Sequence, residues 1–168
     1  MDDESRALIS CIPRLRRYAR ALVGERTDAD DLVQDTLERA WDKLSTWRRG
    51  YDMRAWLFGI MHNLYVDRVR KPTLMTTVLD EDTPIPAVYP AHTDKLEMRD
   101  METALTMLPA DQREILLLVA LEEMTYEEVA ATLRIPVGTV MSRLARAREK
   151  LRELMEGRTV APSLKVVK

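Results

Sequence analysis

Cysteine, histidine and phenylalanine are scarce in this chain of 168 residues. It contains one cysteine, Cys11, two histidines and one phenylalanine. A single thiol excludes a disulfide within the chain and favours a reducing compartment. His62 and His92, together with that thiol, do not have the spacing of a zinc site. We therefore expect neither a disulfide framework nor a zinc centre.

Long apolar runs and glycine-rich loops are missing as well. The longest apolar run, residues 115–121, is too short to cross a bilayer, and the acidic start MDDES lacks the basic flank of a signal peptide. No GxSxG elbow, phosphate-binding glycine loop or paired Cys and His is present. These absences predict a cytoplasmic protein with no membrane insertion, no cofactor and no enzymatic activity.

One acidic cluster could suggest a metal site. It lacks the glycine at the sixth position and the distal glutamate of a calcium loop. Acids near the start of a helix are stabilised by the helix dipole, which explains the cluster more simply. We expect no metal there; the cluster consists of Asp28, Asp30, Asp31 and Asp35.

Charge is strongly segregated although the net charge is only −2. Residues 43–71 carry +5 and residues 134–168 carry +6, whereas residues 72–133 carry −10 and residues 1–42 carry −3. Two basic segments separated by an acidic one predict two contacts with a polyanion.

Helical periodicity dominates the first 72 residues, and no strand-like alternation occurs. We expect helices from near Pro13 to Gly24, from after Thr27 to about Leu44, and from Asp52 to about Arg70. In the second helix, Leu32, Thr36 and Trp41 fall outside the main apolar stripe, which predicts an exposed flank. The inward stripe positions are Val33, Leu37, Ala40 and Leu44 in the second helix, and Trp56, Leu57, Ile60 and Leu64 in the third.

A proline-rich acidic stretch, residues 73–94, has no sustained period and predicts a flexible linker. A second helical module should occupy residues 95–157 and a short tail residues 158–168. We therefore predict an all-α fold of two small helical domains, residues 1–72 and 95–157, joined by this linker.

The stretch TYEEVAATLRIPVGTVMSRLARAREKL, residues 125–151, predicts a helix-turn-helix. Thr125 and Glu128 form a capping box, and Pro136 suits the first position of a second helix that should end before Gly157. From residue 137 to 152 that helix carries five basic residues and one acid. A basic stripe opposite a buried one is suited to a DNA major groove, although a solvated charged face is the simpler alternative.

Five of the nine aromatic residues lie between Ser45 and Tyr65, interleaved with arginines. Aromatic faces stack on unpaired bases while arginines hold phosphates, which is a combination suited to single-stranded nucleic acid. Trp56 and Phe58 are better explained as core residues, since they lie within a helix among apolar neighbours. Trp47 and Tyr51 lie in a loop and favour the nucleic-acid interpretation.

Two sets of residues together resemble the extracytoplasmic-function group of bacterial RNA polymerase sigma factors. The first comprises DADDLVQDTLERAW, residues 28–41, and RAWLFGIMHNLYVDRVRK, residues 54–71. The second is LPADQREILLLVALEEMTYEEVAATLRIPVGTVMSRLARAREKL, residues 108–151. Their order and separation make the resemblance more specific than either set alone. It implies sigma domain 2 at residues 1–72 and sigma domain 4 at residues 95–157.

The resemblance implies three contact surfaces and one regulator. It implies that the chain binds core RNA polymerase, directs it to promoter DNA in double-stranded and melted form, and is controlled by an anti-sigma factor during a stress or environmental response. The implied polymerase contacts are Asp31, Leu32, Gln34, Asp35 and Leu37. The implied minus-10 contacts are Trp47, Arg48, Arg49, Tyr51, Arg54 and Asn63. The implied minus-35 contacts are Thr139, Met141, Ser142, Arg143, Ala145 and Arg146.

The chain departs from its relatives at Met141 and Ala145, where larger basic or aromatic residues are common. Apolar side chains there imply few direct hydrogen bonds to bases and a larger share of shape readout.

The sequence leaves two alternatives open. A helix-turn-helix regulator would have an N-terminal pocket or dimer face, and a small helical hydrolase would use Asp28, Asp31 and His62.

Overall fold

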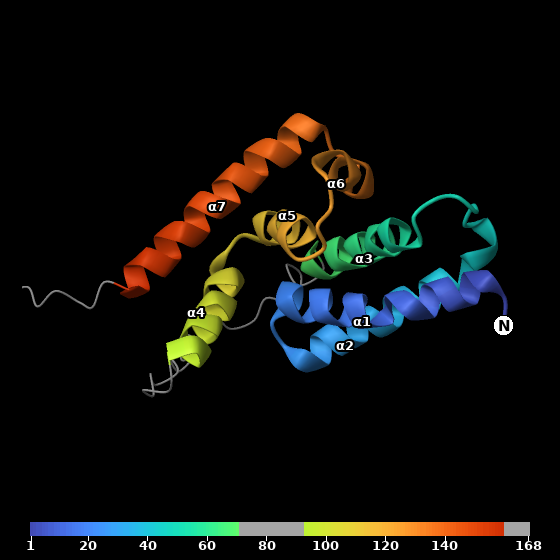
Figure 1. Cartoon of the computed structure of the whole chain (residues 1–168), viewed down its shortest axis with the longest axis horizontal. Helices are drawn as coiled ribbons and strands as arrows, with labels where there is room; N and C mark the ends of the chain where they lie inside the picture. Colours follow the sequence, from blue (N-terminus) through green and yellow to red (C-terminus); the bar gives the residue numbers. More distant parts are fainter. Residues whose placement is uncertain (71–92, 160–168) are drawn as a thin grey trace, which may run out of the picture.

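Seven α-helices and one short 3-10 helix make up the part of the chain that the structure describes, and none of these residues is in a strand (Figure 1). The computed structural model describes residues 1–70 and 93–159. The prediction of a linker at 73–94 therefore lies outside the described residues except for 93 and 94. The prediction of a tail at 158–168 lies outside them except for 158 and 159. The prediction of an all-α fold is confirmed.

Helix α1, Asp3–Val23, begins ten residues earlier than the sequence suggested. Asp2 caps it by accepting a hydrogen bond from the Ser5 N–H at 3.1 Å, and two further acids follow in the first turn. Pro13 lies inside the helix and has no N–H to donate. The helix continues through it because Leu8 before it and Leu15 after it are both buried. The prediction that the helix starts at Pro13 was wrong.

A sharp turn at Gly24 connects α1 to α2. Gly24 has φ +82°, a conformation that favours glycine, and its N–H donates to the Arg20 carbonyl at 3.0 Å. A Cβ at this position would lie only 3.1 Å from the side chain of Thr106 in the second module. The turn therefore requires glycine for its backbone and for its close approach to the other module.

Helix α2, Arg26–Asp42, is capped by the Glu25 carboxylate. Leu32 and Thr36 are fully buried, and the Thr36 hydroxyl donates to the Leu32 carbonyl at 2.7 Å. The prediction that these two residues lie on an exposed flank was wrong, because α1 and α3 both pack on this helix and widen its buried face. Trp41 is 57% exposed, as that prediction required.

Helix α3, Met53–Arg70, follows the 3-10 helix η1, Leu44–Thr46, and a short loop. Its start is as predicted, because the Asp52 carboxylate accepts a hydrogen bond from the Arg54 N–H at 3.0 Å. Phe58 is buried in edge-to-face contact with Tyr18, with ring centroids 4.8 Å apart. The interpretation of Phe58 as a core residue is confirmed, while Trp56 is half-buried at the edge of the core.

The second module consists of α4, Thr93–Met107; α5, Ala110–Ala120; α6, Tyr126–Leu133; and α7, Val137–Thr159. Helix α4 starts two residues before the predicted boundary. Helix α7 passes through Gly157, where it was predicted to end, since one glycine costs a helix only about 1 kcal/mol. In α5, Ala120 is exposed, whereas Leu117 and Leu118 are buried.

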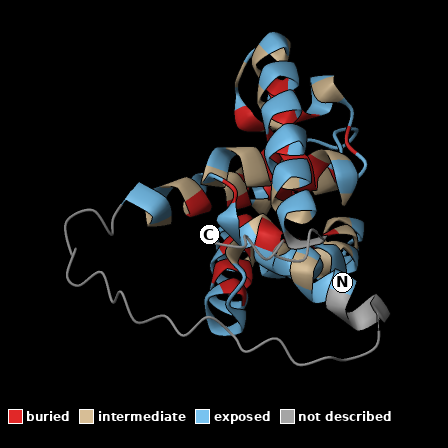
Figure 2. Cartoon of the chain, turned by 90° about the vertical axis from the view of Figure 1, so that its left-hand side faces the viewer, coloured by how far each residue is buried: buried red, intermediate tan, exposed pale blue. Residues whose placement is uncertain are grey.

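The two modules pack against each other in this structure. Helix α6 contacts α3, while α4 and α5 contact α1 (Figure 1). Buried side chains of both modules form one continuous hydrophobic cluster, from Leu8 to Ala147, on the inward faces of the helices (Figure 2). The sequence predicted two separate domains and gave no indication of this contact.

Candidate nucleic-acid interface

The helix-turn-helix forms as predicted from its capping signals. The Glu128 N–H donates to the Thr125 hydroxyl oxygen at 3.2 Å, and the Thr125 N–H donates to the Glu128 carboxylate at 2.9 Å. Arg134 ends α6 in the left-handed region with φ 56°. The Pro136 carbonyl then accepts hydrogen bonds from Thr139 and Val140 and starts α7.

Helix α7 separates a buried face from an exposed basic face. Val140, Leu144 and Ala147 are buried against the module. Most of the predicted minus-35 residues face solvent: Met141, Ser142, Ala145 and Arg146 are exposed, while Thr139 and Arg143 are half-buried.

Two of these side chains are already engaged within the protein. The Arg143 guanidinium lies 3.8 Å from the Asp111 carboxylate at the start of α5. The Ser142 hydroxyl donates to the Thr139 carbonyl at 3.2 Å. Arg146 lines a shallow groove with Gln112 and Glu149. Met141, Ala145 and Arg146 therefore remain the most accessible of the predicted minus-35 side chains.

The loop between η1 and α3 holds four of the predicted minus-10 residues. Arg48 and Tyr51 are exposed, Tyr51 by 67%. Arg49 is exposed and pairs with Glu4 at 3.0 Å, and this contact raises the pKa of its guanidinium. Trp47 is half-buried against the core, and its indole N–H is buried with no hydrogen-bond partner among the described residues. Tyr51, rather than Trp47, is thus the aromatic side chain most accessible for stacking in this structure.

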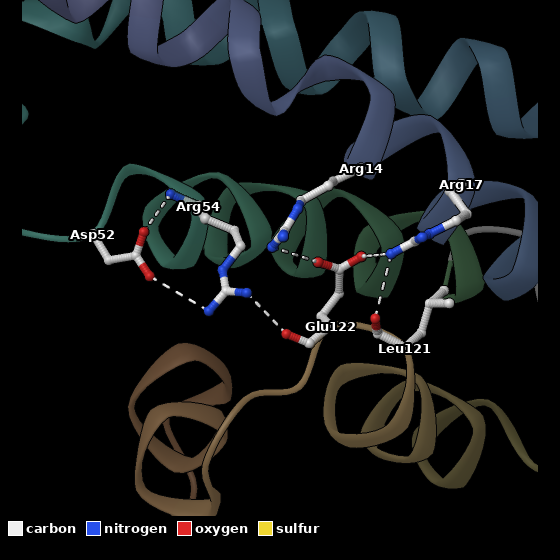
Figure 3. Close-up of polar contacts among 6 residues, drawn as sticks. All are labelled: Arg14, Arg17, Asp52, Arg54, Leu121 and Glu122. Atoms are coloured by element: carbon white, nitrogen blue, oxygen red, sulfur yellow. Dashed lines mark hydrogen bonds and ion pairs between the residues drawn. The ribbon is translucent and has the colours of Figure 1, made fainter.

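The remaining two predicted minus-10 residues lie on α3 and differ in accessibility. Asn63 is exposed. Arg54 is half-buried: its guanidinium donates to the Glu122 carbonyl oxygen at 2.8 Å and lies 3.6 Å from the Asp52 carboxylate (Figure 3). Arg54 is therefore held by the second module, a contact that the sequence did not predict.

Helix α2 presents the predicted polymerase-binding surface, with one exception. Asp31, Gln34 and Asp35 are exposed, and Asp35 pairs with Arg68 of α3. Leu32 is fully buried, so its side chain is not available to a partner, and its prediction as a contact is corrected here.

An apolar groove adjoins this surface between α1 and α2. Leu37 lines it together with Leu8, Ile9, Ile12 and Trp41. Ile9 and Trp41 are 44% and 57% exposed and were missing from the predicted site. The sequence marked Trp41 as lying outside the core stripe, but it gave no signal for Ile9, because the first helix was expected to begin after it.

The contact between the modules is polar at its edge, a feature that sequence reasoning missed. Glu122, between α5 and α6, is completely buried and lies 3.8 Å from Arg14 and 3.6 Å from Arg17, both on α1 (Figure 3). Burial raises the pKa of the Glu122 carboxyl, and the three nearby arginines, Arg17, Arg14 and Arg54, oppose that shift. Helical periodicity predicts which face of a helix is buried, but it does not predict which helix about a hundred residues away packs on that face. The sequence therefore gave no indication that these side chains meet.

Two further polar contacts join the modules. His62 of α3 pairs with the buried Glu114 of α5 at 2.5 Å. The Arg113 guanidinium donates to the Leu22 carbonyl at 2.8 Å and to carbonyls at the end of α4.

The described residues contain no group of three or more His, Cys, Asp or Glu side chains arranged to hold a metal ion. Among the described helices, none combines the length and the apolar character needed to cross a membrane.

Comparison with known proteins identifies the family. Residues 8–62 match the family described as the Sigma2 domain of PhyR, and residues 98–151 match Sigma-70, region 4. The chain is 39% identical over 151 residues to the ECF RNA polymerase sigma factor EcfG of Rhodopseudomonas palustris, covering 88% of this chain and 82% of the relative. The protein belongs to the extracytoplasmic-function (ECF) RNA polymerase sigma factors, which are transcription initiation factors.

Other relatives agree with this assignment. The RNA polymerase sigma factor CnrH of Cupriavidus metallidurans is 34% identical over 156 residues, covering 84% of this chain and 81% of the relative. The sigma factor RpoE in complex with the anti-sigma factor NepR from Bartonella quintana is similar in structure, with TM-score 0.77 and 34% identity, covering 93% of this chain and 98% of that one. CnrH in complex with the cytosolic domain of CnrY follows with TM-score 0.66 and 30% identity, covering 91% of this chain and 90% of that one.

Proposed function

We propose that three surfaces of this sigma factor divide the work of promoter recognition. The exposed acids of α2 bind core RNA polymerase, together with the groove that Leu37 and Trp41 line. The loop after η1 and the start of α3 bind the minus-10 element, and the exposed face of α7 binds the minus-35 element. One observation supports this division above all: the basic, solvent-facing side of α7 is separate in sequence and position from the acidic, solvent-facing side of α2.

Strand opening requires no chemical step in this proposal. Tyr51 offers an exposed ring on which an unpaired base can stack, and Arg48 offers an exposed guanidinium for a phosphate. Stacking contributes roughly 1–3 kcal/mol per base and offsets the base stacking that is disrupted when the duplex opens. Binding energy alone can thus stabilise the separated strand. Upstream, Met141 and Ala145 favour apolar contact and shape readout over hydrogen bonds to bases.

We further propose that a small anti-sigma protein regulates this chain. The RpoE and CnrH structures that resemble it were both solved as complexes, with NepR and with the cytosolic domain of CnrY. Such a protein would hold the two modules together and cover the polymerase-binding surface. We place the free chain in the cytoplasm and the polymerase-bound fraction on the nucleoid.

Run-off transcription tests the main proposal. Purified core RNA polymerase is mixed with a pool of promoter fragments, with and without the chain, and transcripts are sequenced. We expect initiation at a subset of fragments that share two elements, only when both proteins are present. Promoter fragments whose upstream element has been replaced are the control for that element. Transcription that does not depend on the added chain, or no transcription at all, would overturn the proposal.

A further inference from the structure

Three arginines of the first module converge on one residue of the second. Arg14 and Arg17 are one helical turn apart on α1, and Arg54 is in the first turn of α3. The first two lie 3.8 and 3.6 Å from the Glu122 carboxylate, and the third donates to the Glu122 backbone carbonyl at 2.8 Å (Figure 3). Arg17 also donates to the Leu121 carbonyl at 3.4 Å.

In the part of the chain that the structure describes, the carboxylate of Glu122 lacks hydrogen-bond donors. Its carboxylate is fully buried, and neither oxygen has a hydrogen-bond partner among the described residues. Both ion pairs are longer than a hydrogen bond, and burial raises the pKa of the group. A buried carboxylate without donors loses its hydration and regains little, so this contact holds the modules together only weakly.

The arginines are differently placed. The side chains of Arg14 and Arg17 are 53% and 58% exposed, and Glu122 is the only carboxylate paired with either of them among the described residues. Their cluster continues through Arg54 to Asp52, the residue at the end of the loop that carries Tyr51. When Glu122 moves away, three guanidinium groups face solvent beside that loop. Guanidinium forks bind phosphate oxygens in pairs, and three of them suit successive phosphates of one strand.

We propose that Arg14, Arg17 and Arg54 form a binding site for the backbone phosphates of the non-template DNA strand, and that Glu122 occupies this site while the modules are packed together. The inference rests on the proposed minus-10 role of the neighbouring loop. Glu122 acts as an internal competitor for the phosphate. While the modules are packed together, its carboxylate lowers the affinity of the three arginines for DNA.

The test measures binding of the free chain to a fluorescent single-stranded DNA of twenty nucleotides as salt concentration is varied. E122Q removes the competing charge while keeping the side-chain shape, and E123Q, at the exposed neighbour, is the matched control. We expect E122Q to bind at least about threefold more tightly than wild type, because the neutral amide no longer offsets the charge of Arg14 and Arg17, whose side chains are partly exposed. E123Q should match wild type. An E122Q protein that binds no more tightly than E123Q would overturn the proposal.

A second pair of variants tests the arginines. R14A/R17A removes two charges from the cluster, and R16A/R20A removes two exposed charges from the same helix outside it. In the E122Q background, R14A/R17A should make the negative slope of log affinity against log salt shallower by about 1.4, because each phosphate of a single strand that a side chain neutralises contributes about −0.7 to that slope. R16A/R20A should change it by less than half as much. Equal effects of the two pairs would overturn the proposal.

Holoenzyme measurements keep the test independent of folding and of the proposed function. If circular dichroism shows that E122Q does not fold, the two double variants are instead assembled with core polymerase. The binding of each complex to DNA with an opened minus-10 region is then measured. There too, R14A/R17A must bind more weakly than R16A/R20A for the proposal to stand. If the wild-type chain supports run-off transcription but the two arginine pairs weaken DNA binding equally, only this inference is overturned. If the wild-type chain supports no run-off transcription, the proposed function is overturned instead.

Discussion

Arg146 lies near the middle of the exposed side of α7, one turn from Ser142 and one turn from Lys150. No ion pair within the described residues engages its guanidinium, unlike that of Arg143, which pairs with Asp111. A side chain so placed can contact a base edge or a phosphate in the major groove without first breaking an internal contact. Recognition of the upstream element should therefore depend more on Arg146 than on Arg143.

We expect Arg146→Ala to weaken binding of the polymerase complex to its minus-35 element by about tenfold, since a good contact to a base contributes roughly 1–3 kcal/mol. Binding to core polymerase should not change. The measurement is filter binding of holoenzyme to promoter fragments with and without the upstream element. Arg148→Ala is the control: it removes the same charge about 200° further round the helix. An equal loss for both variants would contradict the assignment.

At the scale of elements, capping predicted where α3 and α6 begin, but the sequence did not show what packs on these helices. Thr125 with Glu128 and Asp52 before α3 were predicted correctly, because a cap is a local pattern of side chain and backbone. The start of α1 was wrongly predicted at Pro13, because the burial of residues on both sides of the proline stabilises the helix by more than one missing hydrogen bond costs. Leu32 was misplaced for a related reason: two neighbouring helices widen the buried face of α2 beyond a single stripe.

The capping box makes a prediction about stability. Thr125→Ala removes the acceptor for the Glu128 N–H and should lower the free energy of unfolding by about 1 kcal/mol. Urea denaturation followed by circular dichroism measures the change. Glu127→Ala, in the same turn but outside the box, should cost less than half as much. A Thr125→Ala protein as stable as wild type would show that the cap contributes nothing to the fold.

Helix α2 makes a prediction about binding. Asp35→Ala should weaken association with core polymerase about three- to tenfold, mainly through a slower association rate that depends on salt, as expected for an exposed interfacial charge. Fluorescence anisotropy with labelled chain measures it. Because Asp35 also pairs with Arg68, an R68A variant reports any effect that comes from breaking the internal pair. Asp30→Ala is the control for an acid near the start of the same helix. Loss of binding in R68A equal to that in Asp35→Ala would contradict a direct contact.

At the scale of the whole molecule, the described structure is a closed form in which one hydrophobic cluster spans both modules. The sequence identified both modules and most of their exposed faces. It did not reveal the closed form, because contacts such as Arg54 with Glu122 join residues 68 positions apart. In this closed form part of the proposed minus-10 surface is engaged, because the Arg54 guanidinium donates to the Glu122 carbonyl. We therefore expect a partner that favours one arrangement of the modules to change the availability of the proposed minus-10 surface.

The buried Glu122 carboxyl predicts how the stability of this closed form varies with pH. Burial raises its folded-state pKa above the unfolded value of 4.5, so between these two values the folded protein binds the proton that the unfolded chain has released. The resulting contribution to stability is fully present below pH 4.5 and is lost as pH rises through the raised folded-state pKa.

The E122Q variant tests this prediction, because its side chain cannot titrate and its stability should lack this dependence on pH. Urea denaturation of both proteins between pH 4.5 and pH 7 measures the difference, and the titrating groups that the two proteins share contribute equally to both. The stability of wild type relative to E122Q should therefore fall as pH rises; a difference that is constant, or that rises with pH, would show that the folded structure does not raise the pKa of Glu122.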